Sequence, residues 1–346
     1  MRSFGMVVMF VFLILGVSLI YGDLIKLPQY NPPEKEQKEN ETVERNLAVI
    51  PKTSEGILRY FEMSSEELIA QIGEPSRIDP SPYQYDWWIY GENSNQYIQF
   101  GIDHGKVVTV FALGRGLNVA PFQIGQSKDM VLKHISFEKS LTLKIKGNEY
   151  RFELTDEELK TRPLVKLDNL WIQLYMDKFK DNLVGVRYMT PETLLIQRPY
   201  SLEYRGELAE QPELTSDEWK PVEKAEELQI FSITNVIREQ YGVGPLQWHE
   251  ETAEVAYQHS KEMKAENYFS HTSPVAGDLS DRLESQEINY VQAGENIAAN
   301  YIDGIAAVIG WLNSEGHRKT MLSDEYTHLG VGVHQKYYTQ NFIVPW

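Results

Sequence analysis

Two histidines and one glutamate in the last third of the chain have side chains suited to metal or acid–base chemistry. They lie in the strings Phe269-Ser270-His271-Thr272-Ser273-Pro274, Gly294-Glu295-Asn296 and Gly316-His317-Arg318. Each string holds turn-forming residues, so we expect folding to gather the three side chains at one polar site. Two neutral imidazoles, with Glu295 as third ligand or as hydrogen-bond acceptor of one ring, would suit Zn²⁺.

Two interpretations of this trio remain open. An open position on a bound zinc ion could activate water and give a hydrolase. Alternatively, Glu295 accepts hydrogen bonds from backbone amides and one histidine, and only fixes the loops around a cleft. No nucleophile with a matched base is evident. Ser270 and Ser273 flank His271, but sequence neighbours rarely have the geometry of a catalytic triad.

The order of these strings resembles that of the CAP superfamily (cysteine-rich secretory proteins, antigen 5, pathogenesis-related 1), in a cysteine-free bacterial form. The resemblance covers about residues 229–346 and includes Trp311-Leu312-Asn313-Ser314-Glu315 and Gly330-Val331-Gly332-Val333. It implies an α-β-α sandwich whose cleft holds two histidines and two acids. His271, Glu295 and His317 then match the first histidine, the first acid and the second histidine.

The second acid of that cleft falls on Ser314 in this chain, with Glu315 beside it. One step along a helix turns a side chain by about 100°, so Glu315 cannot be assumed to face the cleft. The tetrad is therefore incomplete or displaced by one residue. Asn296 and Arg318 are also expected in the cleft. Three other histidines are interpreted as structural or solvent-facing: His249, His259 and His334.

The composition limits the possible partners. The 346 residues include 50 acids and 33 bases, and the formal charge of −17 repels nucleic acid and anionic lipid headgroups. The chain has no cysteine, which excludes disulfides, thiolate catalysis and cysteine-ligated zinc. Its length fits two domains of about 150 residues each, with additional tails.

Residues 1–22 hold an almost wholly apolar run, 4–21, that follows Arg2. A run of about 18 apolar residues can span a bilayer, so the segment is a cleaved signal peptide or a retained signal anchor. The poor cleavage pattern favours the anchor. Residues 23–55 are too polar to offset their ordering entropy and are predicted to be a flexible linker. The protein is therefore expected to be secreted or at the cell surface.

Residues 56–204 are predicted to form a domain of helices and β-meanders. Ser64-Ser65-Glu66-Glu67 is typical of a helix start with a capping box, and Asp103-His104-Gly105 of a hairpin turn. Phe100-Gly101-Ile102-Asp103 is echoed by Leu174-Tyr175-Met176-Asp177, which indicates an imperfect duplication. The region resembles the CAP-associated N-terminal domain of spore-forming bacteria. No catalytic constellation is visible in it.

Residues 205–226 are interpreted as an acidic, solvated hinge, because 203–227 hold nine acids against three bases. In the remaining domain, 227–346, helices are predicted over 225–241, 250–267 and from Asp303 to Trp311. Short strands are predicted over 329–335 and 338–344. The fold class is thus α+β: a helix-plus-meander domain, possibly duplicated, followed by an α-β-α sandwich.

The incomplete tetrad and the lack of a nucleophile favour a non-enzymatic extracellular binding module. Its ligand would be a lipid, a wall component, another protein, or a divalent metal ion such as Zn²⁺ held by His271 and His317. The alternative is a metal-dependent hydrolase, acting on peptides or the wall through His271, His317 and Glu295. In a third interpretation the middle domain recognises the ligand and the C-terminal domain is a rigid spacer.

Overall fold

The computed structural model describes residues 56–92 and 94–346, which belong to one compact unit. The signal segment predicted over 1–22 and the linker predicted over 23–55 lie outside the described residues. Within the described residues, no helix combines the length and the apolar character needed to cross a membrane.

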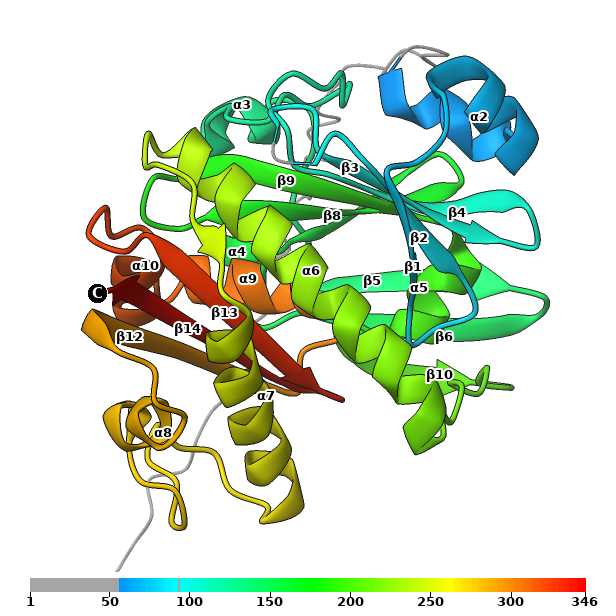
Figure 1. Cartoon of the computed structure of the whole chain (residues 1–346). Coiled ribbons are helices and arrows are strands. Elements are labelled where there is room, and N and C mark those ends of the chain that lie inside the picture. The colour runs from blue at the N-terminus through cyan, green and yellow to red at the C-terminus, as the bar shows by residue number, and fades with distance from the viewer. Residues whose placement is uncertain (1–55, 93) are drawn as a thin grey trace, which may run out of the picture. The chain divides into compact units, whose positions relative to one another are not determined.

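The N-terminal domain is built around two antiparallel sheets (Figure 1). Its strands are β1 (Arg77–Pro80), β2 (Asp86–Tyr90), β3 (Ile98–Asp103), β4 (Lys106–Ala112), β5 (Ser140–Ile145), β6 (Asn148–Glu153), β7 (Leu164–Leu167), β8 (Leu170–Asp177), β9 (Asn182–Met189) and β10 (Ser201–Arg205). Its helices are the 3₁₀ helix η1 (Gly56–Glu62), α2 (Ser65–Ile72), α3 (Lys128–Leu132), α4 (Asp156–Thr161) and α5 (Pro191–Gln197). The large sheet has the strand order β1-β2-β3-β4-β9-β8-β7, and the small one β10-β6-β5.

The large sheet contains two similar units, in agreement with the predicted duplication. The hairpins β3–β4 and β8–β9 lie side by side because β4 pairs with β9. Each hairpin has a register irregularity within the echoed motif, between Gly101 and Ile102 in one and after Tyr175 in the other. In each unit the residue before a helix, Ser64 or Ser127, forms a bridge to the first residue of the hairpin's second strand.

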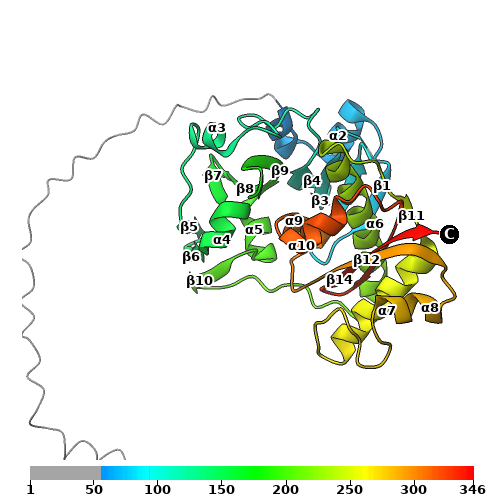
Figure 2. The same cartoon turned by 90° about the vertical axis from the view of Figure 1, so that its left-hand side faces the viewer.

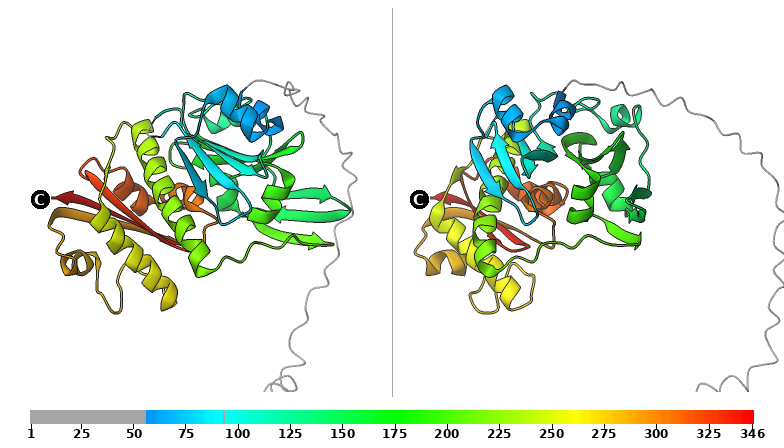
Figure 3. Two further views of the ribbon diagram at one scale, coloured as in Figure 1. Left: turned by 45° about the vertical axis from the view of Figure 1, so that its right-hand side comes forward. Right: turned by 90° about the vertical axis from the view of Figure 1, so that its right-hand side faces the viewer.

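The C-terminal domain is an α-β-α sandwich, as expected. Its helices are α6 (Ser216–Gln240), α7 (Glu250–Ala265), α8 (Leu279–Ser285), α9 (Gly304–Leu312) and α10 (Glu315–Met321). Its strands are β11 (Gln247–Trp248), β12 (Tyr290–Ala299), β13 (His328–His334) and β14 (Tyr337–Pro345), in the order β11-β13-β14-β12. Helices α7 and α8 cover one face of this sheet, and α6, α9 and α10 cover the other (Figures 2 and 3).

Close packing of α7 on the sheet explains the Gly330-Val331-Gly332-Val333 string. A Cβ atom on Gly330 would overlap the backbone nitrogen of Ala253, and one on Gly332 would overlap that of Tyr257. The two glycines therefore let the helix backbone lie directly on β13, while the alternating valines are buried in the core on the other face.

Part of the segment predicted as a solvated hinge, 205–226, is instead helical and buried. Helix α6 begins at Ser216, where Thr215 and Glu218 form a capping box. Three glutamates near its start are buried and accept hydrogen bonds from backbone amides of the C-terminal domain: Glu223 from Gln335, Glu226 from Gly304 and Glu227 from Val333. The acids are dense here because they satisfy backbone donors, and not because they face solvent.

Helix α6 is buried on two sides. On one side, Gln229 donates to Asp79 of β1 and Gln240 donates to the backbone carbonyl of Leu113, both in the N-terminal domain. On the other side, Thr234 accepts from Gln340 of β14 and Asn235 donates to a backbone carbonyl in the C-terminal domain. The helix therefore belongs structurally to both domains.

One hydrophobic core joins the two domains. Buried Tyr97 and Phe111 of the N-terminal domain belong to the same cluster as Ile233 of α6 and Trp311 of α9. A buried ion pair crosses the same interface. Arg187 of β9 lies 2.7 Å from the carboxylate of Asp303, and the two side chains are 0% and 3% exposed. Asp303 is also the N-cap of α9, as predicted.

Candidate functional site

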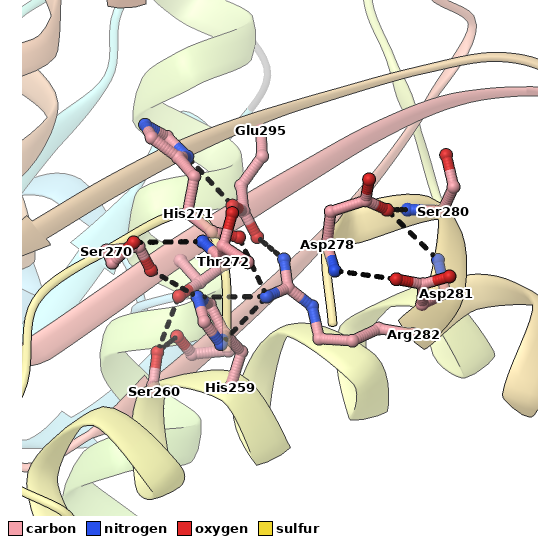
Figure 4. A network of polar contacts seen from close by, with 12 residues as sticks. His259, Ser260, Ser270, His271, Thr272, Asp278, Ser280, Asp281, Arg282 and Glu295 are labelled. Atoms are coloured by element: carbon pink, nitrogen blue, oxygen red, sulfur yellow. Dashed lines mark hydrogen bonds and ion pairs between the residues drawn. The ribbon is translucent and has the colours of Figure 1, made fainter. Parts of the chain in front are cut away.

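The structure brings His271, Glu295 and His317 together, and we call these three residues the histidine site. His271 Nδ1 lies 2.8 Å from Glu295 Oε1 (Figure 4). The ring centroids of His271 and His317 are 6.3 Å apart. The His271 side chain is 55% exposed, whereas that of Glu295 is 4% exposed. One imidazole thus faces solvent above a buried carboxylate.

Three separate elements supply these side chains. His271 lies in the loop after α7, Glu295 in the middle of β12 and His317 within α10. Glu295 therefore lies within a strand, although its string holds a turn-forming glycine. Its neighbour Gly294 marks a close approach within a strand, because a Cβ atom there would overlap the hydroxyl of Tyr326.

The loop that carries His271 is held by Ser273. The Ser273 hydroxyl donates to Glu262 Oε1 at 2.6 Å and accepts from the backbone amide of Ala276 at 2.7 Å. Ser273 itself is buried. The residue therefore has a structural role beside the site.

Both carboxylate oxygens of Glu295 are engaged. Oε1 faces His271, and Oε2 accepts from Arg282 of α8, whose side chain is 5% exposed. Arg282 also donates to the backbone carbonyl of His271 at 3.1 Å (Figure 4). Glu295 is thus an orienting group for one imidazole, held by a buried cation, in the manner of carboxylate–histidine pairs at metal sites.

The sequence alone does not indicate a role for Arg282. The arginine lies 13 residues before Glu295, and no spacing rule connects them, because the pair forms only when α8 packs on β12. Nor did the sequence indicate that His259, interpreted as structural, lies against Arg282. The His259 ring is buried, contacts the guanidinium at 2.9 Å and has its Nε2 3.0 Å from the carbonyl of Ser270. Burial, and then the charge of Arg282, lower the pKa of His259.

His317 is held by Ser314, the residue at the place of the second acid. His317 Nδ1 lies 3.0 Å from the Ser314 hydroxyl. Burial, and then the neighbouring His271, lower the pKa of His317, which favours the neutral form of its imidazole. Beneath the ring, buried Asn296 donates to the His317 carbonyl at 3.1 Å and to Gln340 at 3.2 Å.

Two residues considered for the cleft, Arg318 and Glu315, lie elsewhere. Arg318 pairs with Asp177 at the end of β8 at 2.9 Å and stacks over Phe179 and Tyr241, so its placement in the cleft is wrong. Glu315 is exposed and lines a separate cavity between α4 and α10. Both residues face the N-terminal domain, which docks on α9 and α10. The sequence motifs of the C-terminal domain carry no information about this docking.

Only two side chains of the histidine site, His271 and His317, are available to bind a divalent cation. Within residues 56–92 and 94–346, no group of three or more histidine, aspartate and glutamate side chains is placed to hold a metal ion. The Glu295 carboxylate is paired with Arg282 and is not available as a metal ligand. His271 and His317 could therefore each supply one imidazole nitrogen to a metal ion. Since zinc in proteins is commonly four-coordinate, water or a bound molecule would have to supply the other ligands.

Two further histidines of this domain, His249 and His334, have structural contacts. His249 is the N-cap of α7 and accepts from the backbone amide of Thr252 at 3.3 Å. His334 Nδ1 lies 3.0 Å from Glu223 Oε1 on α6.

Comparisons with known proteins agree with this architecture. Residues 61–200 match the family described as CAP-associated N-terminal, and residues 231–344 match the cysteine-rich secretory protein family. The uncharacterized membrane protein YlbC of Bacillus subtilis is 47% identical over 335 residues, which cover 95% of this chain and 96% of that protein.

Solved structures of two bacterial proteins share the fold. An extracellular protein containing an SCP domain from Bacillus anthracis is 48% identical, with a TM-score of 0.81 over 84% of this chain and 96% of that chain. A cysteine-rich secretory protein from Staphylococcus aureus is 24% identical, with a TM-score of 0.74 over 85% of this chain and 96% of that chain. Both matches extend over the two domains together.

Proposed function

Since the chain belongs to the cysteine-rich secretory protein (CAP) family, with a CAP-associated N-terminal domain before the CAP domain, we propose that it is a non-enzymatic binding module. In this proposal the ligand contacts the imidazoles of His271 and His317. The main support for this proposal is the environment of the Glu295 carboxylate. This carboxylate is buried and paired with Arg282, so it orients His271 and is not free to take a proton from water.

The proposed site of action is outside the cytoplasm. One relative is described as a membrane protein and one solved homologue as an extracellular protein. Together with the apolar run at 4–21, these descriptions support a cell-surface or secreted protein. A signal segment over 1–22 and a linker over 23–55 remain part of this proposal.

A divalent cation such as Zn²⁺ fits the proposed site. His271 and His317 would hold it, with Glu295 and Ser314 fixing the two rings through Nδ1. The bound ion would supply a Lewis-acidic centre to which an anionic or polar group of a wall component, lipid or protein could bind. The lowered pKa of His317 is compatible with this proposal, because only an unprotonated imidazole can bind a metal ion.

The test is a zinc titration by calorimetry at pH 7.5. The wild-type protein is expected to bind about one zinc ion, and the double variant His271→Ala, His317→Ala to bind at least about tenfold more weakly. The matched control is His104→Ala, His134→Ala, which removes two histidines of the N-terminal domain. If the histidine-site variant binds zinc as tightly as this control, the metal site is wrong.

A second measurement separates binding from hydrolysis. The zinc-loaded protein is incubated with purified cell wall and with peptide substrates, and both retention and product release are followed. Retention without products supports the binding module. Turnover that disappears in the double variant would instead establish the metal-dependent hydrolase.

A further inference from the structure

A cavity of about 470 Å³ opens in the N-terminal domain. It is lined by residues of η1, the end of α2, strands β2 and β3 and the loop 116–118, and we call it the η1 cavity. Its volume lies in the range of small-molecule sites, about 300–1,000 Å³. All of its lining residues lie within 56–118, so it is separate from the histidine site.

The walls of the η1 cavity are apolar and partly open to solvent. Ile72, Tyr90 and Leu117 line it and are only half-buried, so part of each side chain is within reach of a ligand. Ile98 and Phe100, which are 6% and 0% exposed, close the cavity on its inner side. A hydrocarbon chain in the cavity would remove the half-buried side chains from water, which favours its binding.

The tyrosine hydroxyls of the cavity already have hydrogen-bond partners. Tyr90 donates to the backbone carbonyl of Gly73 at 3.0 Å, and the Tyr60 hydroxyl accepts from Arg59 at 2.8 Å. Among the described residues that line the cavity, no side chain has a buried polar atom without a partner. The amide groups of a peptide would lose their hydrogen bonds to water in the buried part, which favours a plain hydrocarbon chain there.

Arg59 places a positive charge at the mouth of the cavity. It lines the cavity, is exposed, and has its guanidinium carbon 4.8 Å from the centroid of the Tyr60 ring. The Tyr60 hydroxyl takes one of the five N–H donors of the guanidinium. A guanidinium group can bind a carboxylate through two parallel hydrogen bonds, so Arg59 suits an anionic head group.

Backbone contacts hold the mouth in this shape. The Ile57 amide donates to the Asn118 carbonyl at 3.1 Å, and the Gly116 amide donates to the Asn95 carbonyl at 2.8 Å. A Cβ atom on Gly56 would overlap the same Asn118 carbonyl, so the close approach of η1 to this loop requires glycine. The rim that carries the cation is therefore fixed by the backbone, as in most small-molecule sites.

We propose that the η1 cavity is a second binding site, which takes an aliphatic carboxylate of the fatty-acid type. The alkyl chain lies against Ile72, Tyr90 and Leu117, and the carboxylate binds the guanidinium of Arg59 at the mouth. This site does not depend on the function proposed for the histidines. It gives the N-terminal domain a ligand of its own.

The experiment uses the full-length protein in lipid nanodiscs, so that no detergent competes for the cavity, and saturation-transfer NMR with three probes. Octanoate is expected to bind. Butanoate has four methylene groups fewer, each worth about fourfold when fully buried, and should bind at least about tenfold more weakly. Octanamide keeps the chain but lacks the charge, and should bind about 2- to 5-fold more weakly than octanoate. Empty nanodiscs give the background.

Two variants place the binding in this cavity. Arg59→Gln should weaken octanoate about 2- to 5-fold and leave octanamide unchanged, because it removes only the charge at the mouth. Leu117→Trp enlarges a half-buried wall residue and should weaken both probes at least about tenfold. Arg205→Gln, which changes an exposed arginine of β10, is the matched control. Melting temperatures verify that each variant is folded.

The His271→Ala, His317→Ala variant should bind octanoate like wild type, so failure of the metal site and failure of this site can be told apart. The proposal is overturned if octanoate does not bind, or if butanoate or octanamide binds as tightly as octanoate. It is also overturned if Arg59→Gln and Leu117→Trp both bind octanoate like Arg205→Gln.

Discussion

At the level of single residues, the Arg282–Glu295 pair determines what the histidine site can do. Both side chains are at most 5% exposed, so each charge depends on the other for compensation. The pair also fixes the direction of the His271 ring, because the same carboxylate accepts from its Nδ1. The buried Arg282–Glu295 pair thus holds the solvent-facing imidazole of His271 in one orientation.

We predict that Arg282→Leu lowers the free energy of unfolding by about 3–5 kcal/mol, because it leaves the Glu295 carboxylate buried without its cation. The double variant Arg282→Leu, Glu295→Leu should be less destabilised than the single one, since no buried charge remains. Urea denaturation at pH 7.5 measures both. Arg205→Leu, which removes an exposed arginine, is the control. A single variant no less stable than this control would contradict the argument.

At the level of elements, α6 carries two buried carboxyl groups whose pKa values are strongly raised. Burial raises the pKa of Glu227 from 4.5 to about 7, an effect only partly offset by Lys224. Burial, and then the nearby Asp303, also raise the pKa of Glu226 well above its ordinary value. These carboxyls are the groups that accept from the backbone amides of Val333 and Gly304.

The pKa of Glu227 predicts a pH-dependent stability. The folded protein binds this proton more tightly than the unfolded chain, so the stabilisation is fully present below about pH 4.5. It is lost as the pH rises through about 7 and amounts to about 3 kcal/mol. Urea denaturation of wild type and Glu227→Gln at pH 4.5 and 8 should show the variant gaining in relative stability at pH 8. With the exposed Glu284→Gln as control, equal pH profiles for all three proteins would contradict this prediction.

The elements also show what the sequence could reveal and what it could not. Features that depend on neighbouring residues were predicted correctly, such as the helix cap at Asp303 and the capping box at Ser64. The Gly330-x-Gly332 string was recognised within the resemblance, and its cause is the contact with α7. Local capping signals and the order of the family motifs were therefore sufficient to predict the α-β-α sandwich.

The errors share one cause, which is dependence on packing between distant segments. The acids of 216–227 were interpreted as solvated because their backbone partners lie about 80–110 residues further along the chain. Arg318 was placed in the cleft because its ion-pair partner, Asp177, belongs to the other domain and could not be inferred from the C-terminal sequence. Gly294 was interpreted as a turn residue because the overlapping hydroxyl of Tyr326 is invisible in the local sequence.

At the level of the whole molecule, the two domains are packed as one compact unit. Their shared core and the Arg187–Asp303 pair, at most 3% exposed, connect the large sheet to α9. The N-terminal domain therefore determines the surroundings of the α9–α10 turn, which carries Asn313 and Ser314.

Calorimetry can test this coupling. The wild-type protein is expected to unfold in one transition, whereas Arg187→Met should unfold at a lower temperature and in two resolved steps, because it leaves Asp303 charged and unpaired at the interface. Arg151→Met is the control, since it breaks a pair with Glu203 in which both side chains are at least 50% exposed. If Arg187→Met unfolds like Arg151→Met, the interface does not couple the domains.

The sharing of α6 between both domains has a consequence for how such proteins can be divided or recombined. Ile233 and Val236 lie on the same stretch of helix as Gln229 and Gln240, which bond to the N-terminal domain. A fragment cut before Thr215 would present this apolar stripe to water, and we expect it to self-associate. Exchange of either half between homologues would therefore succeed only where the residues along this stripe suit the new neighbour.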